Sequence, residues 1–156
     1  ATKIAKGSAL GSFLWTWEKD IVIEVQATNA DVVVVLLDPE ADNKAEYKDE
    51  VRTFKNAAIE AGAKQVVWLV RTWVNEPEYE EARPRWEAAL RELDAESNDM
   101  VLIDVTAVLE NSDGSPLRYA QGESGSRIRL REKDGTHLTQ AGAEIYATAV
   151  LKELGL

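Results

Sequence analysis

The stretch VVVVLL at residues 32–37 decides the fold class of this chain. It is apolar without interruption, whereas a strand with one solvated face alternates apolar and polar residues. An unbroken apolar run of this length is typical of a strand buried on both faces of a parallel sheet. Two later runs share the pattern, QVVWLV at 65–70 and MVLIDV at 100–105. The three runs therefore predict buried, parallel strands.

The segments between these runs predict crossover helices. Residues 44–63 carry apolar side chains at steps of four, three and four, which form one helical face: Tyr47, Val51, Phe54 and Ala58. Gly62 supplies a stop for this helix. In the second connection, the positions of Pro77 and Pro84 predict a loop of about a dozen residues and then a helix that begins near Pro84. A loop at the carboxyl end of a strand is a usual place for function.

The last segment, 139–154, predicts a helix that Thr139 caps. One face of it would carry Ala143, Ala147, Val150 and Leu154. Residues 111–116 predict a turn, and the polar stretch 118–133 predicts a long mobile loop. The alternation of strands and helices favours a doubly wound α/β fold, a three-layer α/β/α sandwich with a parallel, flavodoxin-like sheet, in one domain over residues 1–156.

The charge balance narrows the classes of partner. The 156 residues include 18 basic and 28 acidic side chains, for a net charge of −10. Such a chain repels phosphate backbones, so nucleic acid is not expected as a partner, and no apolar run is long enough to insert in a membrane. There is no cysteine, which excludes disulfides and thiolate chemistry and leaves the compartment open.

His137 is the only histidine, so any imidazole base in this chain must be His137. Asp134 precedes it by three positions, a spacing that lets a carboxylate in a turn reach one imidazole nitrogen. The alternative interpretation is an ordinary Asp-Gly turn before a helix, with no chemical role. One histidine and scattered carboxylates do not form a metal-ligand set.

The segment DGTHLTQAG at 134–142 resembles the DxxH block of the SGNH hydrolase family, which lies before the last helix of that fold. The loop at Gly7 resembles the second family block, whose glycine amide contributes to the oxyanion hole, and Asp31 with the run 32–37 resembles the strand before the third block. The resemblance implies that Asp134 orients His137, that His137 activates a serine, and that no metal or cofactor is needed.

Within that family the chain is most similar to the extracytoplasmic SGNH domains of bacterial polysaccharide O-acyltransferases, because Arg127–Arg131 leads into the DGTHLT segment in a similar way. This resemblance implies an acyl ester, such as an acetyl ester, of a carbohydrate-like substrate, and a location outside the cytoplasm. Trp73 directly follows the second strand run, at the functional edge, and is a candidate for stacking on a sugar or lining an acyl pocket.

Two departures from the family pattern bear on activity. The Gly-Asp-Ser block of the nucleophile is not found; either the first strand and helix of the fold lie upstream of Ala1, or the nucleophile is lacking, and Ser8 and Ser12 are weak substitutes. Where the family has Gly-x-Asn-Asp, Glu40 replaces the asparagine, and a lost oxyanion donor costs roughly 3 kcal/mol. Asn43 could substitute only in a rearranged loop.

Two alternative functions stay open. The departures favour a catalytically inactive SGNH-like module that binds or interacts. A flavodoxin-like or nucleotide-binding module would share the sheet, but the chain has no glycine-rich phosphate loop after any strand run.

Overall fold

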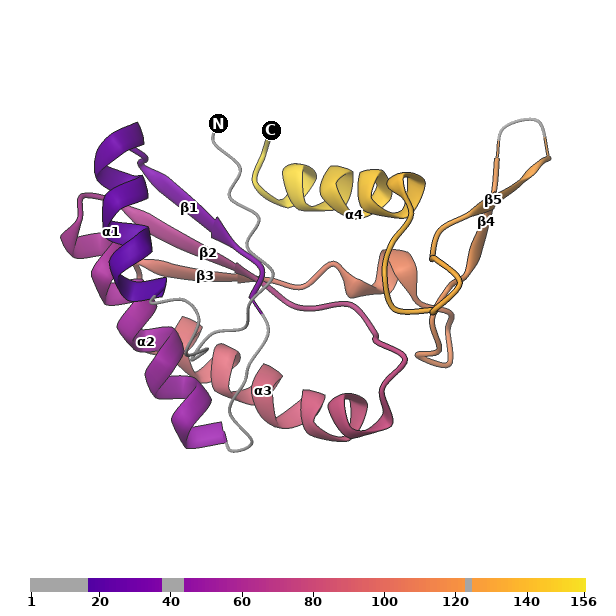
Figure 1. The fold of residues 1–156 in the computed structure, drawn as a ribbon, viewed down its shortest axis with the longest axis horizontal. Coiled ribbons are helices and arrows are strands. Elements are labelled where there is room, and N and C mark those ends of the chain that lie inside the picture. The colour runs from indigo at the N-terminus through magenta and orange to yellow at the C-terminus, as the bar shows by residue number, and fades with distance from the viewer. Residues whose placement is uncertain (1–16, 38–43, 123–124) are drawn as a thin grey trace. The chain divides into compact units, whose positions relative to one another are not determined.

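The computed structural model describes residues 17–37, 44–122 and 125–156, whose elements are shown in Figure 1. The chain divides into two compact units. The sheet unit comprises the chain up to residue 69 together with residues 82–102, and the turn unit comprises residues 70–81 and 103–156. The expectation of one domain over residues 1–156 stays a prediction.

The sheet has the order β1-β2-β3, formed by Val32–Val35, Gln65–Leu69 and Met100–Ile103. β1 pairs with β2 in parallel, with Val32 opposite Gln65 and Val35 opposite Trp68. On the other side of β2, Val66 N donates to Asp99 O at 2.8 Å and Val70 N donates to Ile103 O at 2.9 Å, so both segments advance in the same direction and β3 is parallel to β2. The predicted strands and their parallel arrangement are therefore confirmed.

Two helices of the sheet unit, α1 (Trp17–Thr28) and α2 (Lys44–Glu60), pack against each other. α2 confirms the predicted crossover helix, since its four apolar positions are all buried: Tyr47, Val51, Phe54 and Ala58. The Phe54 and Trp68 rings meet edge to face at 5.6 Å. α1 was not expected, because its apolar positions are interrupted by charged residues in a mixed pattern.

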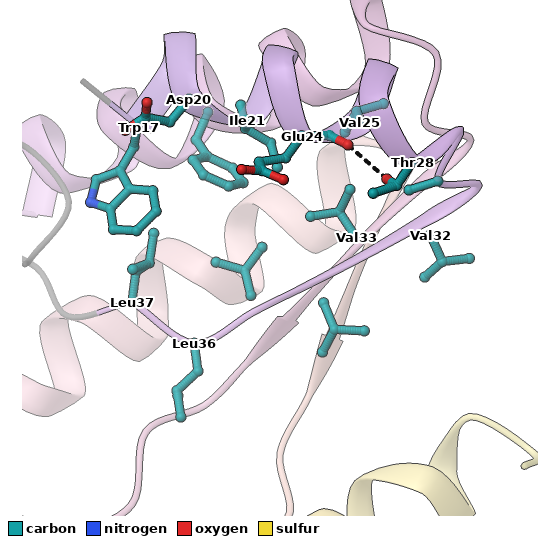
Figure 2. A pocket seen from close by; sticks show the side chains of 14 residues that line it. Trp17, Asp20, Ile21, Glu24, Val25, Thr28, Val32, Val33, Leu36 and Leu37 are labelled. Carbon is teal, nitrogen blue, oxygen red and sulfur yellow. Dashed lines mark hydrogen bonds between the residues drawn. The ribbon is translucent and has the colours of Figure 1, made fainter. Parts of the chain in front are cut away.

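β1 corrects one expectation, because it is not buried on both faces. Val32 is 47%, Val34 49% and Leu36 51% exposed, while Val35 is buried. β1 stands at the edge of the three described strands. The three exposed residues alternate along the chain, so they lie on one face of it, and the described residues leave that face partly uncovered. The residues of β1 line a groove of about 570 Å³ together with α1. Figure 2 shows Trp17, Ile21 and Leu37 among the side chains around this groove.

The helix α3 (Pro77–Glu96) corrects the expectation of a helix that begins near Pro84, since it begins seven residues earlier and contains that proline. Both prolines suit the first position of a helix, where no N–H is needed, and the spacing of apolar residues alone did not separate them. The earlier start is supported by the Glu80 carboxylate, which accepts a hydrogen bond from Val74 N at 2.9 Å.

The turn unit contains the 3₁₀ helix η1 (Thr106–Leu109), the strands β4 (Tyr119–Gln121) and β5 (Arg127–Arg129), and the helix α4 (Gln140–Glu153). β4 and β5 form an antiparallel hairpin, which corrects the long mobile loop expected over 118–133. Ile128 and Ala120 pair across it, although the polar sequence gave no alternating pattern. The turn expected at 111–116 is confirmed by Gly114, whose φ is 79°.

α4 begins where expected, with Thr139 Oγ1 accepting a hydrogen bond from Gly142 N. Its buried face, however, is Gly142, Tyr146 and Val150, whereas Ala143 and Ala147 are exposed. The turn before the helix sets this rotation, because Thr139 N donates to Leu130 O at 2.9 Å and holds the first helical turn against that carbonyl. Only glycine fits there: a Cβ atom on Gly142 would overlap the Leu130 oxygen.

Candidate active site

The loop that carries Asp134 and His137 is closed at its base by main-chain pairing. Arg131 and Leu138 form an isolated antiparallel bridge, and Glu132 N donates to His137 O at 2.7 Å. Gly135 has a φ of 80°, a left-handed conformation that glycine adopts without the steric cost of a side chain. The sequence Asp-Gly thus forms a tight turn whose ends are fixed.

The two carboxylate oxygens of Asp134 have separate tasks. Oδ1 accepts hydrogen bonds from Thr136 N at 2.9 Å and His137 N at 3.0 Å, which shapes the turn. Oδ2 lies 2.7 Å from Nδ1 of the His137 ring. These hydrogen bonds, first that of the His137 ring and then those of the two amides, hold the pKa of Asp134 below its ordinary value. Asp134 is therefore an ionised acceptor at neutral pH.

This geometry sets the tautomer of His137. An ionised carboxylate can only accept, so Nδ1 carries the proton that it donates to Asp134, and Nε2 of the neutral ring keeps a lone pair. The His137 side chain is 78% exposed, which leaves Nε2 open to a reacting hydroxyl. The arrangement can act as a general base with an oriented imidazole. The structure thus brings together the two residues that the sequence analysis singled out.

Asn75 was missed by the sequence analysis and lies directly at this turn. Its Nδ2 donates to Asp134 O at 3.0 Å, and its main-chain N donates to Thr136 Oγ1 at 2.8 Å. Like Trp73, it follows β2 at the carboxyl end of the strand. That position was the feature of the sequence that could have marked Asn75 as a candidate site residue. Asn75 connects the segment after β2 to the backbone that presents Asp134.

Arg131 makes a second connection from inside the turn unit. It is 1% exposed, and its Nη1 donates to Trp73 O at 2.9 Å and to Thr136 O at 3.2 Å. The Trp73 ring centre lies 5.9 Å from its guanidinium carbon. In the sequence, Arg131 was one of several arginines before the DGTHLT segment, and nothing distinguished it as buried.

Trp73, the predicted substrate-binding residue, is half-buried beside Arg131. The Trp73 carbonyl and the Thr136 carbonyl accept hydrogen bonds from the same atom of Arg131, so Trp73 helps to hold the 134–137 turn in place. A role in binding substrate stays a prediction. Five residues named from the sequence lie outside the described ranges: the predicted oxyanion glycine Gly7, and Ser8, Ser12, Glu40 and Asn43.

The groove between α1 and β1 is a separate feature of the sheet unit. Its polar lining comes from α1, where Thr28 Oγ1 donates to Glu24 O at 2.6 Å (Figure 2). The described residues that line it include no imidazole or serine, so we place the candidate chemistry at Asp134 and His137 instead. Within the described ranges, no three His, Asp or Glu side chains gather as metal ligands would. None of the helices in that part of the chain is long and apolar enough to cross a membrane.

A family model described as "Protein of unknown function (DUF459)" matches residues 14–153, nearly the whole chain. No curated protein matches the sequence. A solved structure described as that of "a putative platelet activating factor from Streptococcus pneumonia" is similar in fold, with a TM-score of 0.55. The two chains are 17% identical, and the match covers 85% of this chain and 67% of the other. At that identity the similarity confirms the α/β fold and nothing finer.

Proposed function

The chain belongs to the DUF459 family, and we propose that it is an SGNH-type serine ester hydrolase or O-acyltransferase. Its substrate would be an acyl ester, such as an acetyl ester, of a carbohydrate-like molecule. The observation that carries this proposal is the 2.7 Å contact between Asp134 Oδ2 and His137 Nδ1, in a turn that leaves Nε2 exposed. The fold of the solved neighbour is compatible with it.

The proposed reaction has two steps. His137 Nε2 takes the proton from a serine hydroxyl as its oxygen attacks the ester carbonyl, and Asp134 stabilises the imidazolium that results. The tetrahedral intermediate collapses to an acyl-serine, and His137 returns the proton to the leaving alcohol. Water or an acceptor hydroxyl then attacks the acyl-serine carbonyl while His137 takes its proton, and His137 returns that proton to the serine oxygen as the bond to the acyl group breaks, which releases the acid or the new ester. The amide of Gly7 is our candidate oxyanion donor.

The chain offers a matched control for the role of Asp134. Asp113 sits in a second Asp-Gly turn, where Gly114 has a φ of 79° and Asp113 Oδ1 accepts from Ser115 N at 2.9 Å. In both turns the aspartate Oδ1 accepts a hydrogen bond from the main-chain N two residues later, but no histidine follows Asp113 within its turn. A comparison of the two positions therefore separates catalysis from turn formation.

The test measures hydrolysis of 4-nitrophenyl acetate by the full-length protein. We expect His137→Ala to abolish turnover and Asp134→Asn to lower kcat by at least about a hundredfold, because the amide favours the wrong imidazole tautomer. Asp113→Asn should leave kcat within about twofold, since surface changes away from the site are small. Equal effects of the two Asp→Asn changes would contradict the proposal.

A fluorophosphonate, which reacts with activated serines, addresses the missing nucleophile. Labelling of one serine, lost in His137→Ala, supports the acyl-serine step. An inactive SGNH-like module, which the altered third block favours, would show neither labelling nor turnover.

A further inference from the structure

Arg118 lies against the turn that holds the Asp134–His137 pair. Its Nη2 is 3.3 Å from the point where a Cβ atom on Gly135 would sit. The absence of a side chain at Gly135 therefore gives the guanidinium room beside the turn. The backbone of Arg118 is fixed as well, because its carbonyl accepts a hydrogen bond from Leu130 N at 2.9 Å.

Among the residues that the structure describes, no carboxylate forms an ion pair with Arg118. Neither Arg118 nor Arg131 forms an ion pair there, although the protein has a net charge of −10. By contrast, Lys55 meets Asp99 at 2.9 Å in the sheet unit. In so acidic a protein, an exposed arginine without an ion pair beside the candidate site calls for an explanation.

Arg131 adds a second, buried positive charge. Its Nε and Nη2 are buried and have no hydrogen-bond partner in the described ranges. Burial lowers the pKa of Arg131, the attraction of Glu110 and then of Glu80 opposes that shift, and the repulsion of the nearby Arg118, the smallest of these effects, lowers the pKa further. The two guanidiniums thus repel each other, and an anion bound at Arg118 would relieve that repulsion.

We propose that Arg118 binds a carboxylate or phosphate group of the substrate, so that the ester presented to His137 belongs to an anionic sugar. This inference rests on the proposed function and names the substrate class of the same site. The exposed fork of a guanidinium matches either anion with two parallel N–H donors, while Arg131 contributes long-range attraction from its buried position.

The test compares acetyl esters of glucose, glucuronic acid and glucose 6-phosphate, which differ only at carbon 6. For the full-length protein we expect kcat/KM to favour at least one anionic ester by about tenfold, the usual effect of one charge-assisted hydrogen bond. Arg118→Gln should bring the ratio of anionic to neutral kcat/KM close to one. Arg85→Gln is the matched control, since Arg85 is also exposed and has no ion pair in the described ranges.

The control should keep the wild-type ratio. A ratio near one in the wild type, or the same ratio in Arg118→Gln as in the wild type, overturns the inference. Preference for the uronate or for the phosphate ester identifies the source of the anion.

A binding measurement separates this inference from the proposed function. If no ester is hydrolysed, the proposed function fails, and the anion site is then judged by titrating the full-length protein with glucuronate, glucose 6-phosphate and glucose. Saturable shifts of the Gly135 and Thr136 amide resonances with an anion but not with glucose support the site. They should need at least about fivefold more ligand in Arg118→Gln. No response, or an equal response to glucose, overturns it.

Discussion

Asn75 shows how a single side chain can fix the turn of the candidate catalytic pair from outside that turn. Asn75→Ala removes the donor to Asp134 O, a hydrogen bond worth about 1 kcal/mol in stability. We expect kcat for ester hydrolysis to fall several-fold with little change in KM, because the turn that orients His137 loosens. Asn111→Ala is the control, since its Nδ2 donates to Ser115 Oγ in the other Asp-Gly turn. Equal losses of kcat in both variants would show a general effect on stability.

The acid response of the turn follows from Asp134. Its folded-state pKa is depressed, so its contribution is present above the unfolded value of about 3.9 and is lost as pH falls through the folded value. We expect the side-chain carboxyl resonance of Asp134, followed by ¹³C NMR, to show its protonation step only below about pH 4. A protonation step of that carboxyl centred above about pH 4 would contradict this assignment.

The residue pattern identified the Asp134–His137 pair because the two residues are three positions apart and meet within one turn. Asn75 could not be found in that way, since 59 positions separate it from Asp134. Arg131 was equally hidden, because burial of one arginine among several depends on long-range packing. Contacts within one turn can be predicted from a single sequence, whereas contacts between residues far apart in the sequence cannot.

At the scale of elements, Gly142 gives a prediction whose sign is informative. In an ordinary helix, Gly→Ala stabilises by about 1 kcal/mol. In α4 the added Cβ would overlap the Leu130 carbonyl oxygen, so Gly142→Ala should instead destabilise by about 1–3 kcal/mol or more. Urea unfolding followed by circular dichroism measures the change, and a gain in stability would show that α4 is not held close to Leu130.

Element types were predicted well where several residues agreed, as in α2, whose four apolar positions at helical spacing are all buried. The predicted buried face of α4 was wrong because an alanine-rich helix has several comparable apolar faces. The hydrogen bonds of the turn at Thr139 determine which of these faces is buried. The hairpin β4–β5 was missed for a related reason: its strands have three residues each, too few for a periodic pattern.

For the whole molecule, the connectivity of the two units predicts cooperative unfolding. The chain passes between them after residues 69, 81 and 102. We expect Leu93→Ala in the sheet unit and Leu109→Ala in the turn unit, both buried, each to cost about 2–5 kcal/mol and to lower one shared thermal transition. Calorimetry checks this, and two separate transitions, each sensitive to one variant, would contradict the prediction of a single domain.

β1 has a consequence for the chain in concentrated solution. Four consecutive valines at the edge of the described sheet, two of them about half exposed, have the composition of segments that join molecules into aggregates. Val34→Lys places a charge on this strand, the device by which natural edge strands avoid such pairing. Light scattering at rising concentration should therefore show less aggregation in Val34→Lys than in the wild type.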